Sequence, residues 1–293
     1  MTTATATATA IAAPPARAGI GEFVRRHPTV VIGCSLLFAI VIASMAAPWL
    51  ATVDPISINP AQRLRSPSAE HWFGTDRFGR DLYSRVIYGG RVSLVVGLSV
   101  AALSTAIGLV IGLVSGFLRT VDAVVMRVMD GMMAIPAIML AIALIALSKA
   151  SVIIVIVAVT LPEVPRVVRL VRSIVLTLRE QPYIEAATAI GTSLPRIMLR
   201  HLLPNALPPL IVQATYICAS AVLIEAALSF LGAGTPPEIP SWGNIMAEAR
   251  PYFQLKPLMV LLPGIFLAVT VLAINLVGDG LRDMLDPRLA RKM

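Results

Sequence analysis

The ionisable residues that could do chemistry gather in one polar segment. Asp76 and Asp81 lie there beside Arg77, Arg80 and Arg85. Paired carboxylates can act as general acid and base, so this spacing could belong to an active site. No nucleophile or metal-ligand cluster accompanies them, however, and an ion-paired, turn-rich cap explains the same pattern. We therefore expect these five residues to have a structural role.

Motifs for other chemistry are absent from the sequence. It contains no GxxxxGK[ST] phosphate loop and no HExxH, GxSxG or CxxC motif. An ATPase needs the first to hold phosphate, and the others mark metalloproteases, serine hydrolases and dithiol redox proteins. Cys34 and Cys218 both lie inside apolar runs, which favours neither a disulfide nor a zinc site. We predict that this chain is not an enzyme and has no cofactor or metal of its own.

Three acidic residues lie within or at the ends of apolar runs, where a charge is costly and often functional. Asp130 can pair with Arg127, three residues earlier on the same helical face. Glu225 could line a transport pathway or could be buried in helix packing. Asp279 lies where the last apolar run ends.

The composition is that of a polytopic membrane protein. Apolar residues make up 57% of the chain and charged residues 14%, and the mean hydropathy is +0.83. Several apolar runs exceed the roughly 20 residues that cross a bilayer as a helix. The net charge of +8 could suggest nucleic acid, but no basic stripe is interleaved with aromatic residues. The sequence therefore predicts an all-α membrane protein that does not bind nucleic acid.

Six transmembrane helices account for the apolar runs, at about residues 29–52, 93–117, 121–147, 152–176, 209–231 and 257–277. The stretch 132–161 could be a single long run, but the polar turn at 148–151 favours two spans. Residues 1–28, rich in Thr and Ala, form a predicted disordered tail, and 282–293 a second tail. The five later spans form a core over 92–281.

The number of spans and the distribution of charge predict the orientation. An even number places both termini on one side, and the positive-inside rule makes that side the cytoplasm. The segment 53–91 then faces outward despite its arginines, which its acidic residues partly neutralise.

One polar segment, 181–205, interrupts the apolar runs on the cytoplasmic side. Pro182 suits the first turn of a short helix, and Gly191 suits the left-handed position just beyond its end. Glu185 would lie near the positive end of that helix dipole. Tyr183, Ala187 and Ile190 follow at helical spacing and predict one apolar side. The remaining residues predict a second short helix, capped by Ser193, carrying His201 and ended by Leu203, Pro204 and Asn205.

This segment carries a family resemblance. Glu185-Ala186-Ala187, followed by Gly191 and then by Leu203-Pro204, resembles the EAA loop of ABC importer permeases. His201 stands where isoleucine is usual, and HLLPN is typical of the dipeptide, oligopeptide and nickel branch. Segments 71–85 and 275–288 resemble the same branch.

The resemblance implies a type I, MetI-like permease fold in the bacterial cytoplasmic membrane. It implies a heterodimer with a homologous permease, two ATP-binding domains that hold ATP and Mg, and an extracytoplasmic substrate-binding protein. The implied cargo is a dipeptide or oligopeptide, with nickel or glutathione as alternatives. The residues implied in ATPase coupling are Tyr183, Glu185, Ala186, Ala187, Gly191, His201, Leu203, Pro204 and Asn205.

An ion-coupled secondary transporter is the alternative of a different class, since it too is polytopic and contains buried acids. Such a protein commonly has two repeated halves in one chain. We find no such repeat, and the 181–205 segment would then have no evident purpose.

Overall fold

The computed structural model describes residues 28–148 and 150–285, which are mostly helical and contain no strand. The main helices are α2 (Pro28–Met45), α3 (Ala47–Leu50), α4 (Leu82–Phe117), α5 (Arg119–Met133), α6 (Ala137–Ala146), α7 (Val152–Arg179), α8 (Pro182–Ala189), α9 (Leu194–Ile197), α10 (Leu203–Phe230), α11 (Trp242–Ala249) and α12 (Leu258–Leu285). The tails predicted at 1–28 and 282–293 lie largely outside the described residues. Where they are described, Pro28 begins α2 and 282–285 end α12.

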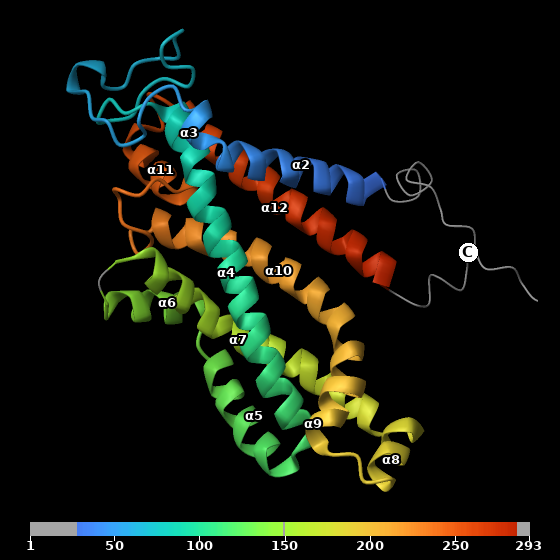
Figure 1. The fold of residues 1–293 in the computed structure, drawn as a ribbon. Coiled ribbons are helices and arrows are strands. Elements are labelled where there is room, and N and C mark those ends of the chain that lie inside the picture. Colours follow the sequence, from blue (N-terminus) through green and yellow to red (C-terminus); the bar gives the residue numbers. More distant parts are fainter. Residues whose placement is uncertain (1–27, 149, 286–293) are drawn as a thin grey trace, which may run out of the picture.

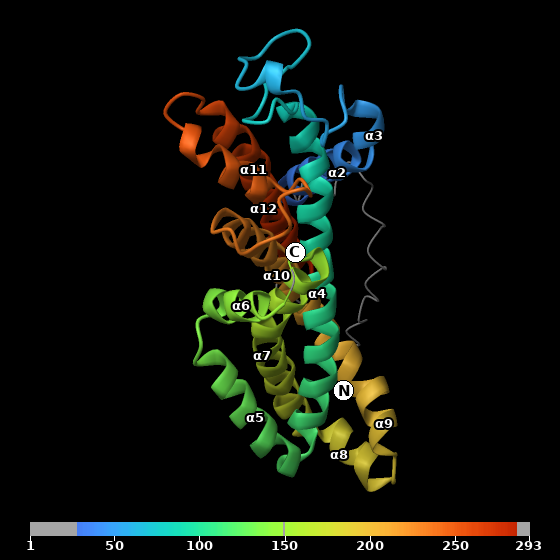
Figure 2. The ribbon, with the colours of Figure 1, turned by 90° about the vertical axis from the view of Figure 1, so that its left-hand side faces the viewer.

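Helix α4 is the axis of the molecule. Its 36 residues span about 54 Å at 1.5 Å per residue. Figure 1 shows it running from the loops and α11 at one end to α8 and α9 at the other. Figure 2, turned by 90°, shows α5 and α7 beside the half of α4 that is nearer α8. The long helix thus connects two polar ends that are far apart.

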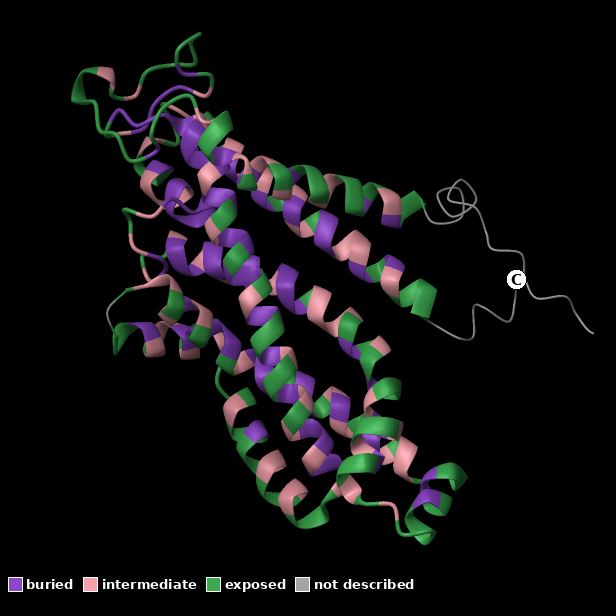
Figure 3. Cartoon of the chain, in the orientation of Figure 1, coloured by how far each residue is buried: buried purple, intermediate pink, exposed green. Residues whose placement is uncertain are grey.

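Close packing of α4 against α7 forms the main core. Gly108, Gly112 and Gly116 repeat every four residues along α4, and each faces a valine of α7. A Cβ at Gly112 would lie 2.7 Å from the Cβ of Val171, closer than real Cβ contacts allow. Small residues at this spacing let helix backbones approach closely. The buried residues accordingly lie between the helices in Figure 3, and exposed ones lie outside.

Among the described residues, four helical stretches are long and apolar enough to cross a membrane: α2, α4, the stretch Leu194–Phe230, and α12. The pair α5 and α6 is a fifth if counted as one span. Helix α7 is long enough, but its charged residues, including Glu163, Arg166 and Arg169, exclude it on composition. The predicted six spans are thus supported for four or five.

Two predicted boundaries are wrong. The span predicted over 121–147 is not one helix, because α5 and α6 meet at an angle of 86°. Pro136 lies in the break; it lacks an N–H, and it disfavours helical geometry at the residue before it. The loop predicted over 53–91 is also too long. Helix α4 already begins at Leu82, where the Asp81 side chain caps it by accepting a hydrogen bond from the Ser84 N–H.

Candidate functional site

The segment 181–205 begins with a helix that is terminated as predicted. Pro182 lies in the first turn of α8, and Gly191 has a φ of +79°. The N–H of Thr192 donates to the carbonyl of Ala187, and that of Gly191 donates to the carbonyl of Thr188, both at 3.0 Å. This is a Schellman ending, which needs the left-handed conformation that glycine adopts at no steric cost.

The residues predicted to share one apolar side of this helix differ in burial. Ile184 and Ala187 are buried against the rest of the chain, whereas Tyr183 is half-exposed and Ile190 is 82% exposed. The sequence analysis missed Ile184 as the anchor of α8. Because α8 is short, the two residues on its inward side decide how it sits. Tyr183 and Ile190 are then free to meet another protein.

The sequence predicted that the second short helix ends at Leu203-Pro204-Asn205. This prediction is wrong, because the helix continues through these residues. Helix α9 passes through a π-helical turn, Met198–Leu202, directly into α10. A π turn changes the hydrogen-bond register and can accommodate Pro204, whose ring would clash in an ordinary helix interior. The side-chain amide of Asn205 donates to the carbonyl of His201 at 2.7 Å. These residues therefore continue the helix through its widened turn.

The π turn and α8 meet through their aromatic residues. The ring centroids of Tyr183 and His201 lie 6.1 Å apart. The side chain of Leu199, which sequence reasoning did not select, is 65% exposed on the same turn. Glu185 and Ala186 are exposed on α8. The candidate residues thus form a short helix pair whose exposed side is part apolar.

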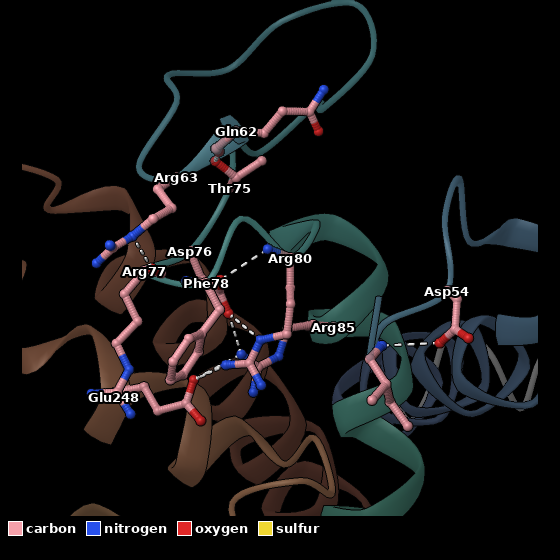
Figure 4. Close-up of polar contacts among 11 residues, drawn as sticks. Asp54, Gln62, Arg63, Thr75, Asp76, Arg77, Phe78, Arg80, Arg85 and Glu248 are labelled. Carbon is pink, nitrogen blue, oxygen red and sulfur yellow. Dashed lines mark hydrogen bonds and ion pairs between the residues drawn. The ribbon is translucent and has the colours of Figure 1, made fainter. Parts of the chain in front are cut away.

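The polar segment before α4 is an ion-paired cap, as predicted. The Asp76 carboxylate accepts from Arg80 Nε at 2.6 Å and is also paired with Arg85. Both arginines reach Glu248 of α11, which lies 2.8 Å from Arg85 Nη1. Figure 4 shows these side chains converging. Sequence reasoning missed Glu248, because this residue is distant along the chain. The cluster ties the segment before α4 to α11.

A second pair locks the same segment. The Nδ1 atom of His71 lies 2.9 Å from the Asp81 carboxylate, whose other oxygen caps α4 through Ser84. Thr52, which follows α3, donates to that second oxygen at 3.1 Å. Asp81 therefore joins three parts of the chain. All its close partners serve the cap, and this fits a structural role.

The acidic residues near the apolar runs have different surroundings. Glu225 is fully buried; Ser229 Oγ donates to it at 2.9 Å and Ser93 Oγ at 3.1 Å. This geometry fits the helix-packing alternative, and a pathway role for Glu225 stays a prediction. Asp279 accepts from the Tyr216 hydroxyl at 2.6 Å.

The expected pairing of Asp130 with Arg127 is wrong. The Asp130 carboxylate instead lies 2.5 Å from Arg169 of α7. Nearby, Asp122 of α5 pairs with Arg172. An ion pair within one helix competes with partners on a neighbouring helix, and packing of α5 on α7 supplies the nearer guanidinium group.

These features define a multi-pass helical membrane protein that presents a short, exposed helix pair at one end and a rigid polar cap at the other. The chain belongs to the family of binding-protein-dependent transport system inner membrane components, whose model matches residues 105–291. It is a membrane permease subunit of an ABC importer. The expected class and fold are confirmed.

Similar curated proteins carry peptide-transport names. The chain is 49% identical to a probable peptide ABC transporter permease of Sinorhizobium fredii, with 92% of each chain covered. It is 41% identical to the dipeptide transport system permease DppC of Alkalihalophilus pseudofirmus, covering 90% of this chain and 88% of that protein. The di/tripeptide permease DppC of Pseudomonas aeruginosa is also 41% identical, over 88% and 87%.

A solved structure shows the same fold. A chain of the inward-facing MetNI methionine ABC transporter is 24% identical, with a TM-score of 0.50, and covers 69% of this chain and 96% of its own. At this identity the likeness supports the arrangement of helices alone.

Proposed function

We propose that this chain is one half of the membrane channel of a peptide importer and that it carries dipeptides or oligopeptides inward at the expense of ATP. Its similarity to peptide permeases over about nine-tenths of its length supports this cargo. The ATP and Mg would be held by partner subunits, because this sequence has no phosphate loop.

The single observation that carries the mechanism is the way α8 is joined to the long helices. Only two residues, Glu180 and Gln181, separate α7 from α8. On its other side α9 continues without interruption into α10. A displacement of α8 can therefore reach α7 through two residues, and α10 through the turn at 190–193 and α9. We propose that a cleft of the ATPase subunit receives α8 and α9, and that closure of the ATPases rotates α7 and α10.

The partners and the orientation follow from this proposal. A homologous permease completes the pathway, two ATP-binding domains engage the α8 ends, and a substrate-binding protein delivers the peptide at the cap. The α8 end then faces the cytoplasm, as do both termini, and the cap around Asp76 faces outward.

The test is reconstitution of the chain in proteoliposomes with its partner permease, ATPases and binding protein. We expect uptake of radiolabelled dipeptide that requires ATP and the binding protein, and no ATPase activity from the chain alone. Uptake of nickel or glutathione in place of peptides would refute the cargo but keep the machinery. Peptide uptake driven by a proton or sodium gradient without ATP would refute both.

A further inference from the structure

Helix α7 is long enough to cross a membrane, but it carries charges near its middle and is not among the apolar candidate spans. Its 28 residues extend about 42 Å, so Glu163 and Arg166 lie more than about 15 Å from either end. Where charged residues lie within a bilayer, they almost always face the interior of a bundle or a water-filled cavity rather than lipid. The exposure of these side chains therefore bears on whether lipid, protein or water surrounds them in the membrane.

Arg166 is held by a buried partner but remains accessible. The carboxylate of Glu163, whose side chain is 2% exposed, accepts from Arg166 Nη1 at 3.0 Å. The Arg166 side chain is 56% exposed, and its other donors make no hydrogen bond with the residues that the structure describes. A guanidinium group has five N–H donors, so Arg166 has donors left for another group.

A second pair lies one helical turn further along α7. Arg169, 44% exposed, contacts Asp130 of α5, which is 57% exposed. We call Glu163, Arg166, Arg169 and Asp130 the charged face. Its two positive and two negative charges cancel. Phe38, exposed near the middle of α2, shows by contrast that apolar side chains occupy positions that can meet lipid. Within a bilayer, such a face would have to meet protein or water instead.

We propose that the charged face lines the aqueous substrate pathway and that Arg166 binds the terminal carboxylate of a peptide in transit. This inference rests on the proposed peptide cargo. Dipeptides of every sequence share a terminal carboxylate, and the planar guanidinium group can bind it with two parallel hydrogen bonds. In this proposal Arg166 recognises the terminal carboxylate that all peptides share, and it does not select among their side chains.

The test uses the complete transporter in proteoliposomes, with Cys34 and Cys218 replaced by alanine. Arg166→Cys should lower peptide uptake by about tenfold or more, the scale of one lost charge-assisted hydrogen bond. Binding-protein-stimulated ATPase activity should persist. Aminoethyl methanethiosulfonate, which restores a positive charge, should recover part of the uptake, and the negatively charged sulfonatoethyl reagent should not. Phe38→Cys is the control and should react with neither reagent.

A structural explanation needs its own variant, because removing Arg166 leaves the Glu163 carboxylate buried and unpaired. The double variant Glu163→Gln/Arg166→Gln removes both charges. If Arg166 binds the peptide, this variant should stay defective and lose the wild-type preference for a free carboxylate over a C-terminal amide. Recovery of uptake in the double variant would overturn the proposal.

The remaining outcomes are also decisive. Two results would refute the role of Arg166 but leave the proposed cargo intact. One is normal uptake by Arg166→Cys, and the other is a cysteine at this position that does not react with the hydrophilic reagents in the assembled transporter. Failure of the unmodified transporter to take up any peptide would instead refute the proposed cargo, and with it the peptide carboxylate as ligand.

Discussion

The rings of Tyr183 and His201 lie 6.1 Å apart and are tilted by 52°. One belongs to α8 and the other to the π turn that leads into α10, so their contact joins the two halves of the proposed coupling segment. The contact becomes possible because the chain reverses at Gly191.

Gly191→Arg should abolish coupled transport while leaving expression intact. The φ of +79° costs an ordinary residue about 1–2 kcal/mol, although no atom lies within 4 Å of the added Cβ. The bulk of the arginine therefore falls on the surface proposed to meet the ATPase, and no internal clash arises. Gly191→Asn is the matched control, because asparagine tolerates the left-handed region. Uptake, ATPase activity and recovery of the complex should all separate the two variants.

Ile184→Ala should lower stability, whereas Ile190→Ala should weaken binding to the ATPases, although both residues lie in or beside α8. Ile184 is 2% exposed, so its truncation should destabilise the chain by about 2–5 kcal/mol. Ile190 is exposed, and its truncation should leave the melting temperature unchanged but weaken co-purification with the ATPases. Thermal unfolding in detergent and pull-down assays measure the two effects. Equal melting temperatures for both variants would contradict the assignment of Ile184 as the anchor.

Asp76→Asn should destabilise the cap strongly. Its carboxylate is buried between Arg80 and Arg85, and removing one partner of a buried ion pair typically costs about 3–5 kcal/mol. Limited proteolysis of the segment before α4 should accelerate together with a drop in melting temperature. Glu70→Gln, an exposed acid in the same segment with no ion pair among the described residues, should change neither.

Gly79→Ala should be far more damaging than Gly232→Ala, although both glycines have positive φ. A Cβ at Gly79 would lie 1.8 Å from the carbonyl oxygen of Asn59, which is backbone and cannot move aside cheaply. Around Gly232 the space is open, so alanine there should cost only the backbone strain of about 1–2 kcal/mol. Yield and melting temperature in detergent give the comparison. Similar losses in both variants would show that the contact with Asn59 is not rigid.

A labelling experiment tests the proposed orientation. A cysteine replacing Ser68 should react with an impermeant thiol reagent in intact cells, because it lies in the segment proposed to face outward. A cysteine replacing Thr188 on α8 should react only after lysis. Both positions are exposed in the structure, so burial does not explain a difference. Labelling of Thr188→Cys in intact cells would show that the α8 end faces outward, opposite to the proposed orientation.

The class of this protein and the ends of α8 could be predicted from the sequence alone. Apolar runs of membrane length and the pattern from Glu185 to Pro204 were sufficient for the helical permease fold. Pro182 and Gly191 marked the bounds of α8 correctly, because helix starts and left-handed endings depend on the residues next to them. The capping role of Asp81 is local in the same way, although the sequence analysis described it only as part of an ion-paired cap.

Which residues meet across the chain depends on tertiary packing and could not be predicted from the sequence. Arg169 displaced Arg127 as the partner of Asp130, and Glu248 joined Asp76 from a distant helix. Ile184 faces inward and Tyr183 is exposed, because the neighbouring helices set the orientation of so short a helix. The physical reason is common to all three. Local sequence fixes backbone geometry over a few residues, whereas ion pairs and burial depend on which helices pack together.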